Sequence, residues 1–217
     1  MRTRFLVLSL IGAISSWSGT EAQTVTVSGK LFVPFNPPAV ACGMPVNALQ
    51  FEGTDVYLTS QTITLMPFIG ADVQVTGTLV GANCTLVDVA SIGAAPYVVE
   101  TCGGGALNCG ARINLKGPGG GVFGLFIGLD GGFFPSSVAG GTFLLDPATS
   151  ILAAIAPEPG PTTTFDVLIP VDPALFALTF RLQAVRQGPP LPGVLQWSTL
   201  DTIFTGTFTT PCHGTQC

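Results

Sequence analysis

Apolar and polar residues alternate in short runs along most of this chain, and glycine and proline separate the runs. The clearest run lies within residues 164–185. One set of its alternating positions is apolar and the other is mixed: Phe176, Leu178, Phe180, Leu182 and Ala184 against Ala177, Thr179, Arg181, Gln183 and Val185. A period of two residues predicts a strand with one buried face. Asp172 and Pro173, just before it, predict the N-cap and first position of a one-turn helix.

Before residue 101 the same pattern predicts a series of short strands. The strand-like runs are 25–33, 49–51, 56–58, 62–66, 73–80, 83–92 and 97–100. Gly29 and Gly77 stand in strand interiors, where a glycine indicates a bend or a bulge. No run in this half has the period of a helix.

After residue 110 the strand-like runs continue. They are 111–115, 122–129, 142–145, 151–156, 165–185, 194–197 and 202–209. Turn signals roughly every 8 to 12 residues are typical of a sandwich or barrel. The glycine-rich segment 101–110 predicts the boundary between two units. We therefore expect an all-β protein with a barrel at 24–101, an antiparallel β-sandwich at 103–210 and a short tail at 211–217.

The N-terminus has the pattern of a secretory signal peptide. Arg2 and Arg4 precede an apolar run at residues 5–14, which is too short for a membrane-spanning helix of about 20 residues. Small residues at Thr20 and Ala22 then form a cleavage site. Residues 1–22 are therefore predicted to be removed, with the protein secreted or held in the periplasm or extracellular envelope. The alternative is a buried N-terminal helix.

The six cysteines predict disulfides, because their count is even and the chain is predicted to be exported. The preferred pairs are Cys42 with Cys84, Cys102 with Cys109, and Cys212 with Cys217, among 15 possible pairings. The last two pairs would close short loops. A zinc site is the alternative, but the chain has no C-x-x-C motif and one histidine. No metal is therefore predicted.

The composition excludes some partners. The chain has 7 Lys and Arg against 12 Asp and Glu, which gives a net charge of −5. So few cations cannot neutralise many phosphates, so we expect neither nucleic acid nor an anionic membrane as a partner. Only 9% of residues are charged, and 28 glycines and 18 prolines fit short strands joined by turns.

The first half resembles small exported OB-fold-like barrels. The resemblance rests on the segments 27–31 (VSGKL) and 69–79 (IGADVQVTGTL) and on Cys84 in the following strand. Its glycines would let short strands coil sharply. Barrels of this kind bind oligonucleotides or oligosaccharides on the face of strands two and three. The resemblance therefore implies a ligand face, expected here around Tyr57, Phe51 and Phe68.

The second half, from residue 107 to 206, resembles a recurrent β-sandwich module of secreted proteins from environmental bacteria, which has no established activity. The matching positions are Leu168, Ile169, Pro170, Asp172, Pro173, Leu175, Leu178, Thr179, Phe180, Gln183, Ala184 and Ser198. Ala177 stands where the module usually has glycine, and Thr199 where it usually has asparagine.

Catalytic patterns are weak in this sequence. The single histidine, His213, lies near the C-terminus, where a base would not be held rigidly against a nucleophile. The acids are scattered, mostly in turns where they bond to nearby backbone: Glu52, Asp55, Asp72, Asp88, Glu100, Asp130, Asp146, Glu158, Asp166, Asp172 and Asp201. Paired carboxylates for glycoside hydrolysis are therefore the less favoured interpretation.

Four smaller motifs are weak indications of a binding or modification site. Gly119, Gly121 and Gly124 fit a phosphate-binding pattern, but no strand-turn-helix surrounds them, which favours a hairpin turn. Asn83 to Thr85 fits a glycosylation acceptor. The turn at Asp130 lacks the serial oxygens of a calcium loop. The alternation predicts that Trp197 lies on a core face, with carbohydrate stacking as the alternative.

We therefore expect a non-catalytic, exported structural or interaction protein that uses no cofactor. The alternative is a carbohydrate- or protein-binding module that uses the barrel face, and a secreted hydrolase is the third hypothesis. The expected partner is an extracellular polysaccharide or an envelope protein.

Overall fold

The computed structural model describes residues 23–34, 48–80, 84–103, 109–136, 139–189 and 191–206. These residues are all β, with two single-turn 3-10 helices, η1 (Met66–Phe68) and η2 (Pro173–Leu175), which confirms the predicted class. The predicted signal peptide, Cys42, His213 and the tail at 211–217 lie outside the described residues.

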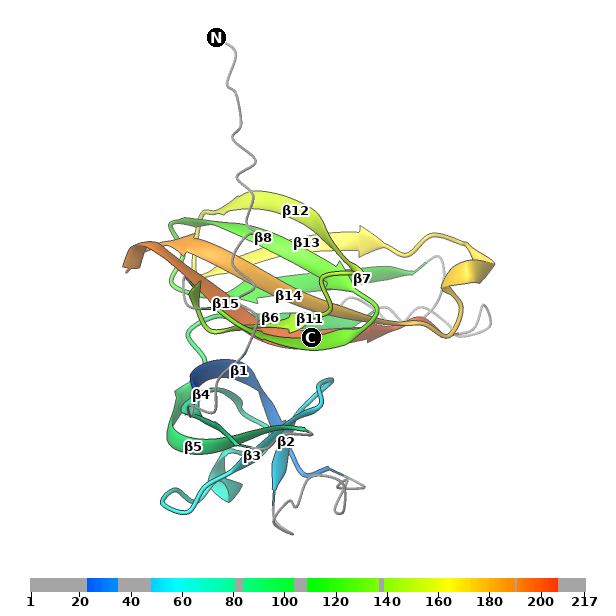
Figure 1. Ribbon diagram of the computed structural model, residues 1–217. Helices are drawn as coiled ribbons and strands as arrows, with labels where there is room; N and C mark the ends of the chain where they lie inside the picture. Colours follow the sequence, from blue (N-terminus) through cyan, green and yellow to red (C-terminus); the bar gives the residue numbers. More distant parts are fainter. Residues whose placement is uncertain are drawn as a thin grey trace.

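Five strands close into a barrel in the order β1-β2-β3-β5-β4 (Figure 1). They are β1 (Thr24–Phe32), β2 (Leu49–Phe51), β3 (Val56–Thr59), β4 (Asp72–Val80) and β5 (Thr85–Ala94). The pair β3–β5 is parallel and the other pairs are antiparallel. The helix η1 lies between β3 and β4 along the chain. The predicted small barrel is therefore confirmed.

Two glycines allow the barrel to close, as their mid-strand positions predict. A Cβ atom on Gly29 of β1 would lie 2.6 Å from the ring of Phe51. A Cβ atom on Gly77 of β4 would lie 2.3 Å from the carbonyl oxygen of Asp88, and the β4–β5 register shifts between Thr76 and Gly77. A side chain at either position would therefore push neighbouring strands apart.

The remaining strands form three more sheets. A five-stranded sheet has the order β10-β15-β14-β8-β12, a three-stranded sheet the order β13-β7-β6, and β9 pairs with β11. The strands are β6 (Val98–Gly103), β7 (Gly110–Lys116), β8 (Gly121–Gly128), β9 (Gly131–Pro135), β10 (Ala139–Gly140), β11 (Thr142–Leu145), β12 (Ser150–Glu158), β13 (Thr162–Leu168), β14 (Thr179–Gly188) and β15 (Leu191–Phe204).

The five-stranded and three-stranded sheets share a core. Their buried side chains are Tyr97, Val99, Ile113, Leu115, Phe123, Leu125, Leu182 and Ala184. We call these two sheets, with β9 and β11, the two-sheet unit. Strand β6 lies in the range predicted for the barrel, but it pairs with β7, so the barrel strands end at Ala94. The segment predicted as a boundary therefore joins two strands of one sheet.

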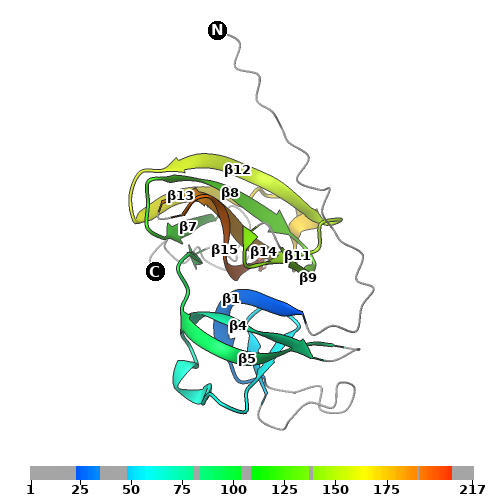
Figure 2. The same cartoon turned by 60° about the vertical axis from the view of Figure 1, so that its left-hand side comes forward.

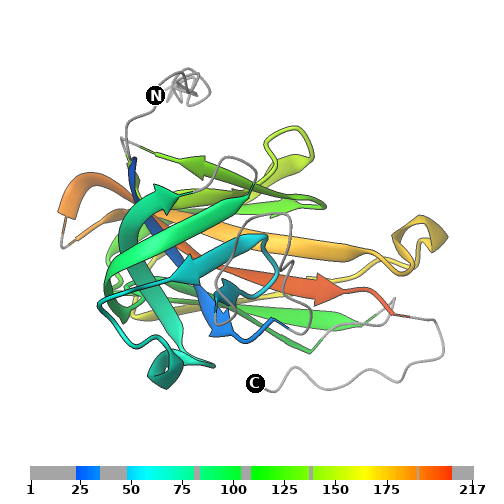
Figure 3. The ribbon, with the colours of Figure 1, turned by 60° about the horizontal axis from the view of Figure 1, so that its bottom comes forward.

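The five-stranded sheet shares a core with the three-stranded sheet on one face, and the barrel covers part of its other face. Figures 1 and 2 show the barrel beneath this sheet, with β1 nearest to it, and Figure 3 shows the barrel strands in front of β14 and β15. Leu144, Leu145 and Leu200 of the two-sheet unit belong to the same core cluster as the barrel interior. The Thr142 hydroxyl donates to the carbonyl of Thr26 in β1 at 2.7 Å. The two units therefore share one core.

Gln183 of β14 joins these layers, although the sequence placed it on the less buried face of its strand. Its side chain is fully buried. Its Oε1 accepts from the backbone N–H of Leu144 at 2.7 Å, and its Nε2 donates to the carbonyls of Thr142 (2.9 Å) and Ser198 (3.2 Å). At Gln183 the mixed face of β14 is therefore buried against β11, while Leu182 and Ala184 fill the core on the other side.

None of the three cysteines in the described part of the chain, Cys84, Cys102 and Cys109, is a free thiol. Which cysteine pairs with which stays a prediction.

The predicted N-cap at Asp172 is confirmed, because its carboxylate accepts from the backbone N–H of Ala174 at 2.9 Å at the start of η2. Just after this helix, Ala177 has a φ of 56°, in the left-handed region that favours glycine. Its N–H is held by the carbonyl of Thr205 at 2.8 Å. The backbone at Ala177 therefore has a conformation that glycine would adopt at lower cost.

Replacing Ala177 by glycine should stabilise the protein. The left-handed conformation costs a residue with a Cβ about 1–2 kcal/mol, and glycine loses about 0.5–1 kcal/mol of entropy, so we expect a gain of a few tenths to about 1 kcal/mol. Urea unfolding measures it. Ala174→Gly, in η2, is the control and should lower stability. If the Ala177→Gly variant is less stable than wild type, the left-handed conformation at this position is contradicted.

Candidate functional site

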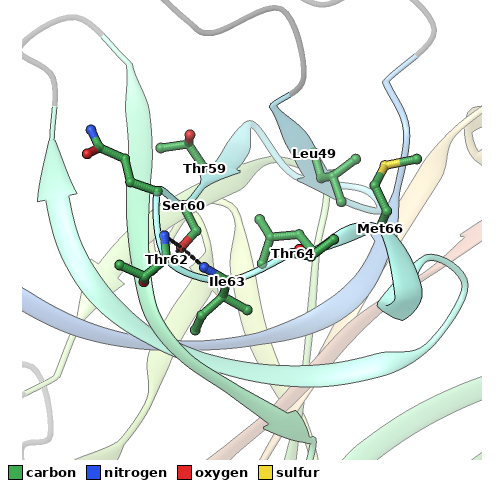
Figure 4. Close-up of a pocket in the computed structure, with 9 residues that line it drawn as sticks. Leu49, Thr59, Ser60, Thr62, Ile63, Thr64 and Met66 are labelled. Atoms are coloured by element: carbon green, nitrogen blue, oxygen red, sulfur yellow. Dashed lines mark hydrogen bonds between the residues drawn. The ribbon is translucent and has the colours of Figure 1, made fainter.

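A hollow of about 270 Å³ opens at the end of the barrel where β2 begins and β3 ends. It is lined by Leu49 and by the consecutive residues 59–66, which connect β3 to η1. Figure 4 shows Leu49, Thr64 and Met66 at one side, with Ser60, Thr62 and Ile63 at the other. Its volume is just below the range of about 300–1,000 Å³ usual for ligand pockets. The hollow has room for one small chemical unit.

Ser60 shapes the loop that lines the hollow. Its hydroxyl donates to the carbonyl of Val89 in β5 at 2.8 Å and accepts from the N–H groups of Thr62 (3.2 Å) and Ile63 (3.0 Å). A serine hydroxyl that bonds backbone two and three residues ahead is a local turn motif. The loop is therefore anchored to the barrel wall.

The hollow is lined by uncharged polar and apolar side chains. Hydroxyls come from Thr59, Thr62 and Thr64, and an amide comes from the exposed Gln61. Apolar surface comes from Leu49, Ile63, Leu65 and Met66, of which Met66 is 58% exposed. None of the nine lining residues has an ionisable side chain. The arrangement can exchange hydrogen bonds with a neutral polar molecule and offers no acid, base or strong nucleophile.

The three aromatic residues expected to bind a ligand do not share one exposed face. Phe51 is fully buried in the barrel core, against Gly29. Tyr57 is 8% exposed and packs with Ala48 and Leu86 outside the barrel core. Phe68 of η1 is half-buried against the barrel core. None of the three lines the hollow.

Trp197, the candidate for carbohydrate stacking, lies in an aromatic cluster. Its ring centroid is 4.8 Å from that of Phe143 and 5.7 Å from that of Phe126, and its residue is 6% exposed. The ring faces are thus occupied by the protein itself, and the indole N–H has no hydrogen-bond partner. This side chain stabilises the contact between β15 and the β9–β11 pair.

The glycine-rich turn at 117–121 surrounds a buried cation. It joins β7 to β8, which belong to different sheets, so the predicted hairpin is wrong. The Arg186 side chain is fully buried and its Nε donates to Glu158 at 2.9 Å. Its Nη2 donates to the carbonyl of Gly119 at 3.1 Å, and a Cβ on Gly121 would lie 3.0 Å from the same nitrogen. Gly119 and Gly120 also have positive φ (73° and 69°), so the turn needs glycine for its backbone conformation as well as for its close approach to neighbouring groups.

The Arg186 cluster has a structural role. The other guanidinium nitrogen, Nη1, donates to the carbonyl of Pro189 (2.8 Å) and to the Gln196 amide oxygen (3.1 Å). The guanidinium carbon lies 5.8 Å from the centre of the Tyr97 ring. Burial, and then the adjacent Glu158 carboxylate, raise the pKa of the Tyr97 hydroxyl above its ordinary range. A buried cation with these partners stabilises the fold and has little capacity left for a ligand.

Each of the two acids near the junction of the two units has a nearby partner. Asp72 faces Lys30 in the β1–β4 register. Asp201 accepts from the backbone N–H and the hydroxyl of Thr101, at 2.6 and 2.8 Å. Neither acid lines the hollow. Across the described residues, no group of three or more histidine, cysteine or acidic side chains is arranged to hold a metal ion.

Comparison of the chain with protein-family models, with curated proteins and with solved structures finds no match. Among the described residues, no helix has the length and apolar character needed to cross a membrane.

Asp72 should make stability depend on pH. Burial raises the pKa of its carboxyl; Lys30 opposes the shift and Asp201 adds to it. The folded protein therefore holds this proton more tightly than the unfolded chain does. The stabilisation of the folded state by protonated Asp72 is fully present below the unfolded pKa of about 3.9. It is lost as the pH rises through the folded pKa of Asp72.

Asp72→Asn should therefore raise the urea midpoint at pH 7, and this advantage should shrink as the pH falls below the carboxyl range. Urea unfolding across pH measures the effect, with Asp130→Asn, at an exposed turn, as the control. A lower midpoint for Asp72→Asn at pH 7 would show that attraction to Lys30 outweighs burial.

Proposed function

We propose that this chain is a non-catalytic, exported interaction module that binds a neutral saccharide unit in the hollow between β3 and η1. The observation that carries the proposal is the lining: hydroxyl and amide side chains together with Leu49 and Met66, and no ionisable group. Sugar hydroxyls exchange hydrogen bonds with such groups, and sugar C–H surfaces pack on apolar side chains. A charged ligand would find no counter-ion there.

We further propose that the barrel is of the OB type and that the two-sheet unit is a β-sandwich. The strand order β1-β2-β3-β5-β4, with β3 parallel to β5 and η1 between β3 and β4, supports the first part. Two sheets facing each other across one core support the second. OB-type barrels bind oligosaccharides and oligonucleotides, and the net charge of −5 favours the saccharide.

Export is supported by the signal-like pattern of residues 1–22 and by the even number of cysteines. The partner that fits this location is an extracellular or cell-wall polysaccharide. The second candidate function is an envelope protein scaffold, which the shared core of the two units favours because it makes them one rigid body. A hydrolase is the least supported, because the hollow holds no carboxylate pair.

Binding to a glycan array and to cell-wall polysaccharides tests the proposal. Wild-type protein should bind a neutral glycan saturably, and the double variant Thr59→Val, Thr64→Val should weaken binding at least about tenfold, because valine keeps the shape and removes the hydroxyls. Thr179→Val, at an exposed position on β14, is the matched control and should bind like wild type.

No binding to any glycan would remove the saccharide proposal and leave the protein-scaffold candidate. Binding that the double variant retains at full strength would show that the ligand site lies elsewhere. Turnover of a bound glycan would contradict the non-catalytic proposal.

A further inference from the structure

Cys102 and Cys109 lie too far apart to bond each other. In the β6–β7 ladder Cys102 is opposite Arg112, which is three positions along the chain from Cys109. The Cys109 carbonyl accepts from the N–H of Ile169 at 3.0 Å, which continues the β13–β7 ladder and keeps the chain extended there. Three extended residues span about 10 Å and neighbouring strands lie about 5 Å apart, which separates the two Cα atoms by about 11 Å. A disulfide needs them within about 7 Å.

The two cysteines also lie on opposite faces of the three-stranded sheet. Cys102 shares a face with Asn114, whose Nδ2 donates to the Cys102 sulfur at 3.7 Å. Cys109 precedes Ala111 by two residues, and Ala111 and Ile113 of β7 face the core. Because side chains alternate along an extended chain, Cys109 lies on this inner face, where it is 2% exposed.

Cys84 belongs to the far end of the barrel. It precedes β5, whose ten residues run about 30 Å along the strand before the chain enters the two-sheet unit. Cys84 packs in one cluster with Ala48, which follows Cys42 by six residues. The barrel therefore favours the bond between Cys42 and Cys84 that the sequence predicts.

The end of β15 lies beside Cys102 and Cys109. The hydroxyl of Thr101, next to Cys102, donates to the carbonyl of Thr202 at 3.3 Å. The next residue of β15 shares a core cluster with the start of β7. Cys212 follows the last described residue of the chain by six positions, which span up to about 20 Å when extended. The tail at 211–217 is therefore within reach of both cysteines.

We propose that two disulfides bond this tail to the three-stranded sheet, one at Cys102 and one at Cys109, each to Cys212 or Cys217. Neither Cys102 nor Cys109 is a free thiol. A local bond between Cys212 and Cys217, with Cys84 held by the barrel, would leave them only each other. The five positions from Cys212 to Cys217 span up to about 17 Å, enough for the separation of about 11 Å.

This proposal rests on the proposed export, because the bonds need an oxidising compartment. Each bond forms when two thiols lose two protons and two electrons by exchange with a protein disulfide, which becomes a dithiol. The two bonds would make the C-terminal segment a clasp that joins both faces of the sheet at the β6–β7 end.

Tryptic mapping of the full exported chain, unfolded in urea with thiols blocked and without reduction, tests the proposal. Trypsin leaves four cysteines on peptide 31–112 and the two tail cysteines on peptide 187–217. These peptides should stay linked and separate only on reduction. Further cleavage by chymotrypsin after Leu107 should give one species of three peptides, in which the Cys102 and Cys109 fragments are both bonded to the tail.

Thiol titration in urea gives a second measurement. The double variant Cys212→Ser, Cys217→Ser should show two free thiols per monomer, whereas a local tail bond predicts none. Cys42→Ser, Cys84→Ser is the matched control and should show no free thiol, with its tail peptide still linked.

Release of peptide 187–217 without reduction, carrying its own internal bond, would overturn the proposal and leave export standing. A wild-type protein with six free thiols would contradict export as well. If the tail variant does not fold, the wild-type map decides alone, and a map with Cys102 bonded to Cys109 would also overturn the proposal.

Discussion

The arrangement of this protein depends on β14, a strand whose middle is buried on both faces. Leu182 and Ala184 fill the core between the two sheets, and Gln183 points the other way. A buried amide is stable only when its donors and its acceptor are paired. Gln183 meets that requirement by bonding the backbone of β11 and β15. Because β11 also bonds β1 through the Thr142 hydroxyl, Gln183 helps to hold the barrel, together with the packing of Leu144 and Leu200 in the barrel core.

The buried ion pair of the two-sheet unit also holds strands together. Arg186 is held by Glu158, by backbone carbonyls and by Gln196, and the glycine-rich turn closes over it. Such a cluster would be costly to open, so it anchors β12 and β14 at that end of the sheet. The barrel hollow, by contrast, has an uncharged lining. It is therefore suited to contacts with a neutral partner.

Local periodicity predicted much of the fold. Alternation located β1, β4 and β14, mid-strand glycines located the bends of the barrel, and Asp172 located η2. Which sheet a strand joins depends on contacts far apart in the sequence, so β6 was assigned to the wrong side of the boundary. Phe51 was expected at the ligand face that the resemblance implies, but it is buried in the barrel core. Alternation alone could not correct this, because it does not tell which face of a strand turns inward. The hollow is lined by threonine, serine and glutamine, which have no distinctive sequence signature.

Equilibrium unfolding in urea tests most directly whether the two units unfold as one cooperative body. Trp197 fluorescence reports on the two-sheet unit, and hydrogen exchange of β1, β4 and β5 reports on the barrel. We expect a single midpoint by both probes, and Gln183→Leu should lower both together because it leaves the Leu144 N–H and two carbonyls unpaired. Two separate midpoints, or a Gln183→Leu variant that shifts one probe alone, would contradict this account.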